Sequence, residues 1–102
     1  MSYEYPTEEQ LEKIKEWDIQ NVKGLVGYIK SLWWYPERQF RLYKSKNQFR
    51  KNIVKLALHT GGWSGNESII SALEQSDFWL LFWEKSTRGG HYWFEIEPNR
   101  FK

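Results

Sequence analysis

The stretch from Arg50 to His59 constrains the fold of this chain most, because the choice between strand and helix there decides how every later element is arranged. Val54, Leu56 and Leu58 alternate with other residues, which is typical of a strand. Apolar residues in the same stretch also recur at helical spacing, so a helix stays open as the alternative. We favour the strand because Gly61-Gly62 follows and leads directly into the start of another helix.

Patterns elsewhere in the chain predict the remaining elements. We expect helices over residues 7–18, 21–34 and 64–75, and further strands over residues 40–43, 78–83 and 91–97. The apolar run from Phe78 to Trp83 is typical of a strand that is covered on both faces. The order is α-α-β-β-α-β-β, which predicts one α+β domain over residues 1–102 with helices packed on a four-stranded mixed sheet.

Two of the predicted helices begin with the sequence of a capping box, in which a hydroxyl residue and a Glu or Gln three residues later bond each other's backbone N–H groups. The two pairs are Thr7 with Gln10 and Ser64 with Glu67. The helix between them contains Gly24 and Gly27, which each weaken it by about 1 kcal/mol relative to alanine. We therefore expect these glycines to allow close packing against another element.

Composition narrows the class of protein. Aromatic residues make up 19% of the chain, including seven tryptophans, and large rings supply much of the apolar area of a small core. Cysteine is absent, which excludes disulfides and thiolate chemistry and fits a cytoplasmic location. The longest apolar run is too short to span a bilayer, so we expect no membrane partner. The sequence predicts no cofactor and leaves monomer and homodimer both open.

Charge is distributed unevenly along the chain. Residues 1–18 contain six acidic residues and two lysines, whereas residues 19–59 contain nine basic residues and one acidic residue. The segment from Arg38 to Lys55 has seven basic residues and no acidic one. This asymmetry has two explanations, either a polyanionic partner or an acidic first helix that folds back over the basic segment.

Two glycine-containing segments carry most of the side chains suited to binding or chemistry, Thr60-Gly-Gly-Trp-Ser-Gly-Asn-Glu67 and Ser86-Thr-Arg-Gly-Gly-His-Tyr92. If residues 50–59 and 78–83 are parallel strands joined through a helix, both segments follow strand ends at the same edge of the sheet. Backbone N–H groups and an arginine there suit an anion, and tryptophans suit a planar ring. We therefore predict a small non-enzymatic binding module whose ligand, a small molecule or a protein, binds at this edge. The candidate residues are Thr60, Gly61, Gly62, Trp63, Asn66, Arg88, His91 and Trp93.

Two alternative functions use other residues. The first is nucleic-acid binding by the basic segment, which is favoured if Arg41, Tyr43, Lys55 and Trp93 share one face of the sheet. Its candidate residues are Arg38, Arg41, Tyr43, Lys44, Lys46, Arg50, Lys51 and Lys55. The second is a small hydrolase or nuclease that uses His59, His91 and Glu67. The predicted capping role of Ser64 and Glu67 weakens both as catalytic candidates.

The glycine segments also carry a resemblance to known sequences. Together with Phe78-Trp79, Trp83 and Ser86, they resemble an uncharacterised family of small bacterial and phage proteins. The resemblance covers residues 60–96, with weaker similarity at Ser31-Leu-Trp-Trp-Tyr-Pro36, and the acidic helix lies outside it. It implies kinship and a mobile-element setting, and it implies no mechanism.

Overall fold

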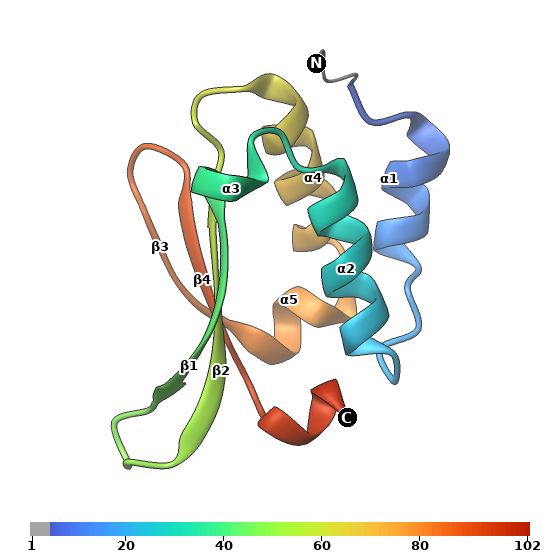
Figure 1. The fold of residues 1–102 in the computed structure, drawn as a ribbon. Helices are drawn as coiled ribbons and strands as arrows, with labels where there is room; N and C mark the ends of the chain where they lie inside the picture. Colours follow the sequence, from blue (N-terminus) through green and yellow to red (C-terminus); the bar gives the residue numbers. More distant parts are fainter. Residues whose placement is uncertain (1–4) are drawn as a thin grey trace.

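The computed structural model describes residues 5–102 (Figure 1). The first half contains the helices α1 (Glu8–Lys15), α2 (Val22–Leu32) and α3 (Pro36–Gln39) and the strands β1 (Phe40–Lys46) and β2 (Asn52–His59). The second half contains α4 (Ser64–Glu74), α5 (Asp77–Phe82), β3 (Trp83–Thr87), β4 (His91–Ile96) and the 3-10 helix η1 (Pro98–Phe101). The two short helices α3 and α5 and the turn η1 are additions to the predicted element order.

The molecule is an α+β fold in two layers, as the sequence predicts. The four strands form one sheet in the order β1-β2-β4-β3, and α1, α2, α4 and α5 all lie on the same side of it (Figure 1). Every pairing in the sheet is antiparallel, so the prediction of a mixed sheet is wrong. The reason is that β4 lies between β2 and β3, which run in the same direction without touching.

Residues 52–59 form a strand, which confirms the interpretation on which the topology depends. Alternate residues of β2 turn towards the helices, and Leu56 and Leu58 are fully buried there. The same alternation in β4 buries Phe94 and Ile96. These residues meet Ile14 of α1, Leu25 and Ile29 of α2, and Ile69 and Leu73 of α4 in one hydrophobic core.

The apolar run from Phe78 to Trp83 is a helix rather than a strand. Residues 77–82 form α5, and the strand begins only at Trp83. Phe78 and Phe82, one helical turn apart, are buried, whereas Leu80 is 83% exposed and Leu81 is 56% exposed. A six-residue apolar run is too short for its period to distinguish the two elements.

Of the two predicted capping boxes, the structure contains the first and not the second. The Thr7 hydroxyl accepts a bond from the Gln10 N–H, and the Gln10 side chain accepts one from the Thr7 N–H. Ser64 instead forms the first turn of α4, and its hydroxyl donates to the Tyr5 hydroxyl at 3.2 Å. The side chains of Ser64 and Glu67 are therefore not occupied by capping α4. The argument that a capping role weakens them as catalytic candidates is wrong.

The two glycines of α2 have different surroundings. A side chain at Gly24 would meet the Asn21 side chain, which caps this helix by accepting a bond from the Gly24 N–H. A Cβ atom at Gly27 would meet nothing within 4 Å, so the expected close packing is wrong there. In the part of the chain that the structure describes, no helix has the length and apolar character needed to cross a bilayer.

Candidate functional site

The two glycine segments meet at one end of the sheet. The Thr60 N–H at the end of β2 donates to the Gly90 carbonyl at the start of β4, at 2.9 Å. Since β2 and β3 run in the same direction and are joined through α4 and α5, the loop after β2 and the turn after β3 lie at the same end of the sheet, as the predicted crossover requires, although the two strands are not neighbours. The antiparallel strand β4 makes the junction between them.

Contacts inside the protein account for several of the predicted ligand-binding residues. Thr60 is only 2% exposed, and its hydroxyl lies where a side chain at Gly90 would have to go. Asn66 is fully buried, and its amide group binds the backbone N–H and carbonyl of Trp34 and the carbonyl of Thr60. These bonds hold the loop after β2 against the segment that follows α2. Thr60 and Asn66 thus stabilise the fold, and their burial leaves neither side chain accessible to a ligand.

The tryptophan of the first segment belongs to an aromatic cluster beside α4. Trp63 stacks on Tyr5 with ring centroids 5.1 Å apart and lies 6.1 Å from the Trp34 ring. Its ring also occupies the space that a side chain at Gly65 would need. Gly61 and Gly62 have positive φ angles of 61° and 77°, which let the chain turn from β2 towards α4. This cluster contains neither His91 nor Trp93.

His91 and Trp93 lie instead on the face of the sheet that is opposite the helices, which we call the open face. Its side chains come from alternate positions of all four strands, and in residues 5–102 none of the helices α1, α2, α4 or α5 covers it (Figure 1). The residues of the open face are Arg41, Tyr43, Ser45, Ile53, Lys55, Ala57, His59, Glu84, Lys85, Thr87, His91, Trp93 and Glu95.

Two histidines face each other across β2 and β4 on the open face. The Nδ1 atoms of His59 and His91 are 2.7 Å apart, a hydrogen-bond distance that requires one ring to donate and the other to accept. Burial lowers the pKa of His59 below its ordinary value, and the charges of His91 and Arg41 lower it further. The neutral form of His59 is therefore favoured in this pair.

Trp93 occupies the middle of a row of residues that crosses all four strands. The register aligns Arg41 on β1, Ala57 on β2, Trp93 on β4 and Lys85 on β3. The Lys85 ammonium lies 4.8 Å from the centroid of the Trp93 ring, and the small Ala57 side chain separates that ring from Arg41. An aromatic ring between two cations on an exposed sheet surface can stack on a planar group and bind the anions attached to it.

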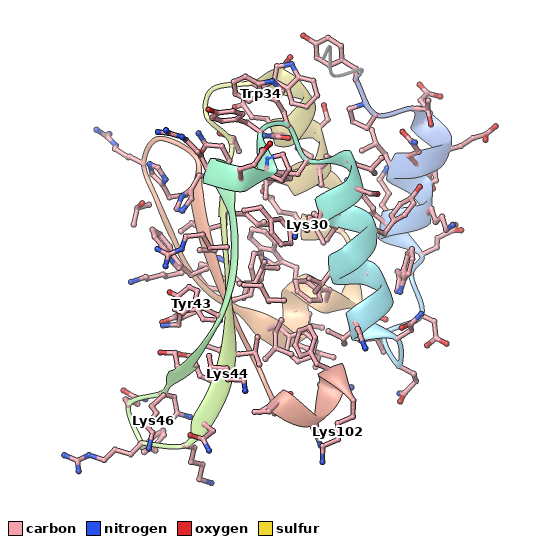
Figure 2. All side chains as sticks on the ribbon, in the orientation of Figure 1. Lys30, Trp34, Tyr43, Lys44, Lys46 and Lys102 are labelled. Atoms are coloured by element: carbon pink, nitrogen blue, oxygen red, sulfur yellow. The ribbon has the colours of Figure 1, made fainter. Side chains whose placement is uncertain are left out.

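Other members of the predicted nucleic-acid set differ in their placement. Tyr43 lies on the open face with the Arg41 guanidinium 5.1 Å from its ring, and Figure 2 shows it on the side away from the helices. Lys55 is also on this face, but it forms ion pairs with Glu84 at 3.3 Å and Glu95 at 4.0 Å. Lys44 points to the helix side of the sheet (Figure 2).

The rest of the basic set lies at the two ends of β1. Arg38 belongs to the short helix α3, whereas Lys46, Arg50 and Lys51 lie around the turn between β1 and β2. This turn borders a hollow of about 380 Å³ on the open face, which Phe49, Lys55, Glu84 and Glu95 also line. Phe49 is 72% exposed there. The hollow is of mixed charge, and the basic residues of the turn lie at the hairpin end of the open face.

The acidic first helix does not cover the basic segment. α1 packs against α4 on the side of the helix layer that is away from the sheet (Figure 1). This arrangement rules out folding back over residues 38–55 as the explanation of the charge asymmetry.

The catalytic alternative lacks its third residue. Glu67 lies on α4 in the helix layer. Burial raises the pKa of Tyr92 on that side of the sheet, and the charges of Glu74 and Glu67 raise it further. The histidine pair lies on the opposite face of the sheet, and no group of three metal-ligating side chains occurs among residues 5–102. His59, His91 and Glu67 do not form one site.

One cation of the open face is missing from the predicted set. Lys85 is absent from that set because the apolar run predicts a strand over residues 78–83, whereas the strand that contains Lys85 spans residues 83–87. Lys85 and Thr87 alternate onto the open face, but the register shift after Trp83 puts Trp83 on the helix side, so alternation over the whole strand does not identify Lys85. Arg88 and Gly89 follow in the turn, where Arg88 is exposed next to the open face.

No family model, curated protein or solved structure matches this chain. The resemblance of residues 60–96 to small bacterial and phage proteins therefore stays a prediction, and the geometry of the open face is what indicates a function.

Proposed function

We propose that the protein is a non-enzymatic binding module that holds single-stranded nucleic acid on the open face of its sheet. The observation that carries this proposal is the row in which Trp93 lies between Lys85 and Arg41 on an uncovered four-stranded surface. Base stacking on an aromatic side chain contributes about 1–3 kcal/mol per base and needs no particular sequence. The absence of cysteine supports a cytoplasmic setting for this binding.

The arrangement of charge supports a strand that crosses the sheet. Adjacent strands lie about 4.8 Å apart, so Arg41 and Trp93 are separated by about 10 Å, which is within reach of a base and its neighbouring phosphates. Arg88 and the basic turn between β1 and β2 extend the cationic surface in two directions. The ion pairs of Lys55 reduce its own contribution, and Arg41 and Lys85 are the phosphate-binding residues that we propose.

The test is fluorescence anisotropy with labelled single-stranded DNA and RNA of about 12 nucleotides, which covers a site of this kind. We expect Trp93→Ala to weaken binding by about tenfold or more, because the stacking energy of one base is lost. Trp93→Phe keeps a ring and should retain most of the affinity. The control is Trp83→Ala, because Trp83 is 46% exposed but aligns with Phe94 on the other face of the sheet.

Salt dependence separates this proposal from non-specific attraction to a basic protein. Affinity should fall between about 50 and 200 mM salt, and Arg41→Ala or Lys85→Ala should each reduce the slope by about one counterion. Equal binding by the wild type and Trp93→Ala, or no binding at the lowest salt, would refute the proposal.

A further inference from the structure

The strand β1 forms one edge of the sheet and has unpaired backbone groups. The Asn47 N–H donates to the Lys51 carbonyl where the hairpin closes, and hydrogen-bonded pairs alternate along an antiparallel ladder. Arg41, Tyr43 and Ser45 therefore bond to β2. Leu42 and Lys44 turn their backbone N–H and carbonyl groups towards the free edge, where another extended chain can pair with them.

An apolar groove runs alongside this free edge on the helix side of the sheet. It consists of two adjoining cavities of about 630 and 260 Å³ between α2, η1 and β1, which share Leu42, Tyr43 and Phe101. Its apolar lining also includes Val26, Gly27 and Phe40, and Leu42 is 44% exposed. The absence of a side chain at Gly27 leaves the space above α2 open.

The charge around the groove selects the kind of chain that can enter it. Among residues 5–102, the charged residues that line its two cavities are Lys23, Lys30, Arg41 and Lys44, and none of the lining residues is acidic. Figure 2 shows Lys30 and Lys44 on this side of the sheet. A second copy of β1 would bring further cations against these, since β1 itself contains Arg41, Lys44 and Lys46 and no acid. Like charges of this kind oppose edge-to-edge pairing of two copies and favour an acidic partner.

The opposite edge of the sheet lacks these properties. β3 is two residues shorter than β1, and the register of its pairing is shifted between Trp83 and Lys85. A shift of this type bends a strand and interrupts an edge as a template for pairing. The free edge of β1 is the better template.

We infer that β1 and its groove bind an extended acidic peptide as a fifth strand, with alternate apolar side chains of the peptide in the groove between α2 and Phe101. The acidic side chains then lie on the other face of the added strand, beside Arg41, and the lysines that line the groove attract them at longer range. In this strand-addition mode, main-chain hydrogen bonds to Leu42 and Lys44 align the peptide with β1, and the groove determines which peptide side chains fit. This site uses the edge of the sheet and the helix side of β1, and it borders the open face at Arg41 and Tyr43, which also line the groove.

The test uses a synthetic peptide of alternating Glu and Val, equal in length to β1 and blocked at both ends. We expect saturable binding by calorimetry, and slowed hydrogen exchange at the Leu42 and Lys44 amides while the Arg41 and Tyr43 amides, already bonded to β2, do not change. A matched peptide with Lys in place of every Glu should not bind. Failure of the Glu peptide to bind, equal binding of both peptides, or protection along β3 instead would overturn the inference.

Gly27 offers a variant that blocks the groove without damaging the fold. Gly27→Leu fills the open space above α2 and should weaken peptide binding by about tenfold or more, which is the cost of leaving one valine side chain unburied. The control is Gly27→Ala, which raises helix propensity in the same way but adds only one carbon atom to the groove. It should retain the wild-type affinity for the peptide. Both variants should unfold at or above the wild-type denaturant concentration. Unchanged binding by a folded Gly27→Leu protein would contradict the site.

Discussion

At the scale of single residues, Gly90 and Gly62 give a matched test of the junction between the two glycine segments. Both have positive φ angles, 79° and 77°, so alanine costs each about 1–2 kcal/mol of backbone strain. A Cβ atom at Gly62 meets nothing within 4 Å, whereas one at Gly90 collides with the Thr60 hydroxyl. We expect Gly90→Ala to lower the free energy of unfolding by about 1–3 kcal/mol more than Gly62→Ala. Equal losses in denaturant unfolding would mean that Thr60 and Gly90 are not packed together.

The histidine pair predicts a pH dependence of stability. Because the pKa of His59 in the folded protein is below 6.5, the unfolded chain binds a proton more readily than the folded one. The stabilisation is complete above pH 6.5, and it is lost as the pH falls from 6.5 through the lower folded-state value. We expect the free energy of unfolding to decrease with acid over this range, and to decrease less steeply in His59→Gln.

The same titration has an internal control. His91→Gln removes the second cause of the lowered pKa and keeps the first, which is burial of His59. Its slope should lie between those of the wild type and His59→Gln. If the wild type and His59→Gln have parallel curves, His59 is not responsible for the acid sensitivity.

At the scale of elements, α5 provides a test that distinguishes helix from strand. A strand over residues 78–83 would turn Phe78, Leu80 and Phe82 to one face, whereas the helix buries Phe78 and Phe82 and exposes Leu80. Leu80→Lys should therefore change the free energy of unfolding by no more than about 0.5 kcal/mol. Phe78→Ala should cost about 3–5 kcal/mol. A comparable loss in both variants would favour the strand.

The elements that the sequence predicts correctly are those whose periodicity is long enough to measure or whose boundaries have their own chemistry. Residues 52–59 alternate over a full strand, and Thr7 begins α1 with both halves of its capping box in place. The prediction for Phe78 to Phe82 is wrong because the run is too short. Five apolar residues fit a buried strand and one and a half turns of helix equally well. Ser64 fails for a different reason: its hydroxyl has a partner in Tyr5, which is 59 residues away in sequence.

At the scale of the whole molecule, strand directions were predictable and strand neighbours were not. The chain order requires the strands that precede the two glycine segments to run in the same direction, and this brings the segments to one edge. Local sequence patterns contain no information on the position of β4 between β2 and β3. That position depends on how the three strands pack together against the apolar side of the helix layer. The open face follows from that arrangement, since Arg41, Trp93 and Lys85 align only when β4 is a central strand.

The whole molecule also separates its charges by layer. The acidic helix α1 lies on the outer side of the helix layer, and the cationic open face lies on the far side of the sheet (Figure 1). A polyanion approaching the protein is repelled at one side and attracted at the other, which orients the encounter before any contact forms.

The central position of β4 also sets when the protein can fold as it is being made. β2 can already pair with β1, but within residues 5–102 β3 pairs with β4 alone, so β3 has no place in the sheet until residue 96 has been synthesised. Before that point the nascent chain exposes the apolar faces of Phe78, Phe82 and Leu58 with no sheet to cover them. We therefore expect the sheet to be completed only after residue 96 has been synthesised, and a chain interrupted before that residue to hold no more than the β1–β2 hairpin in its sheet.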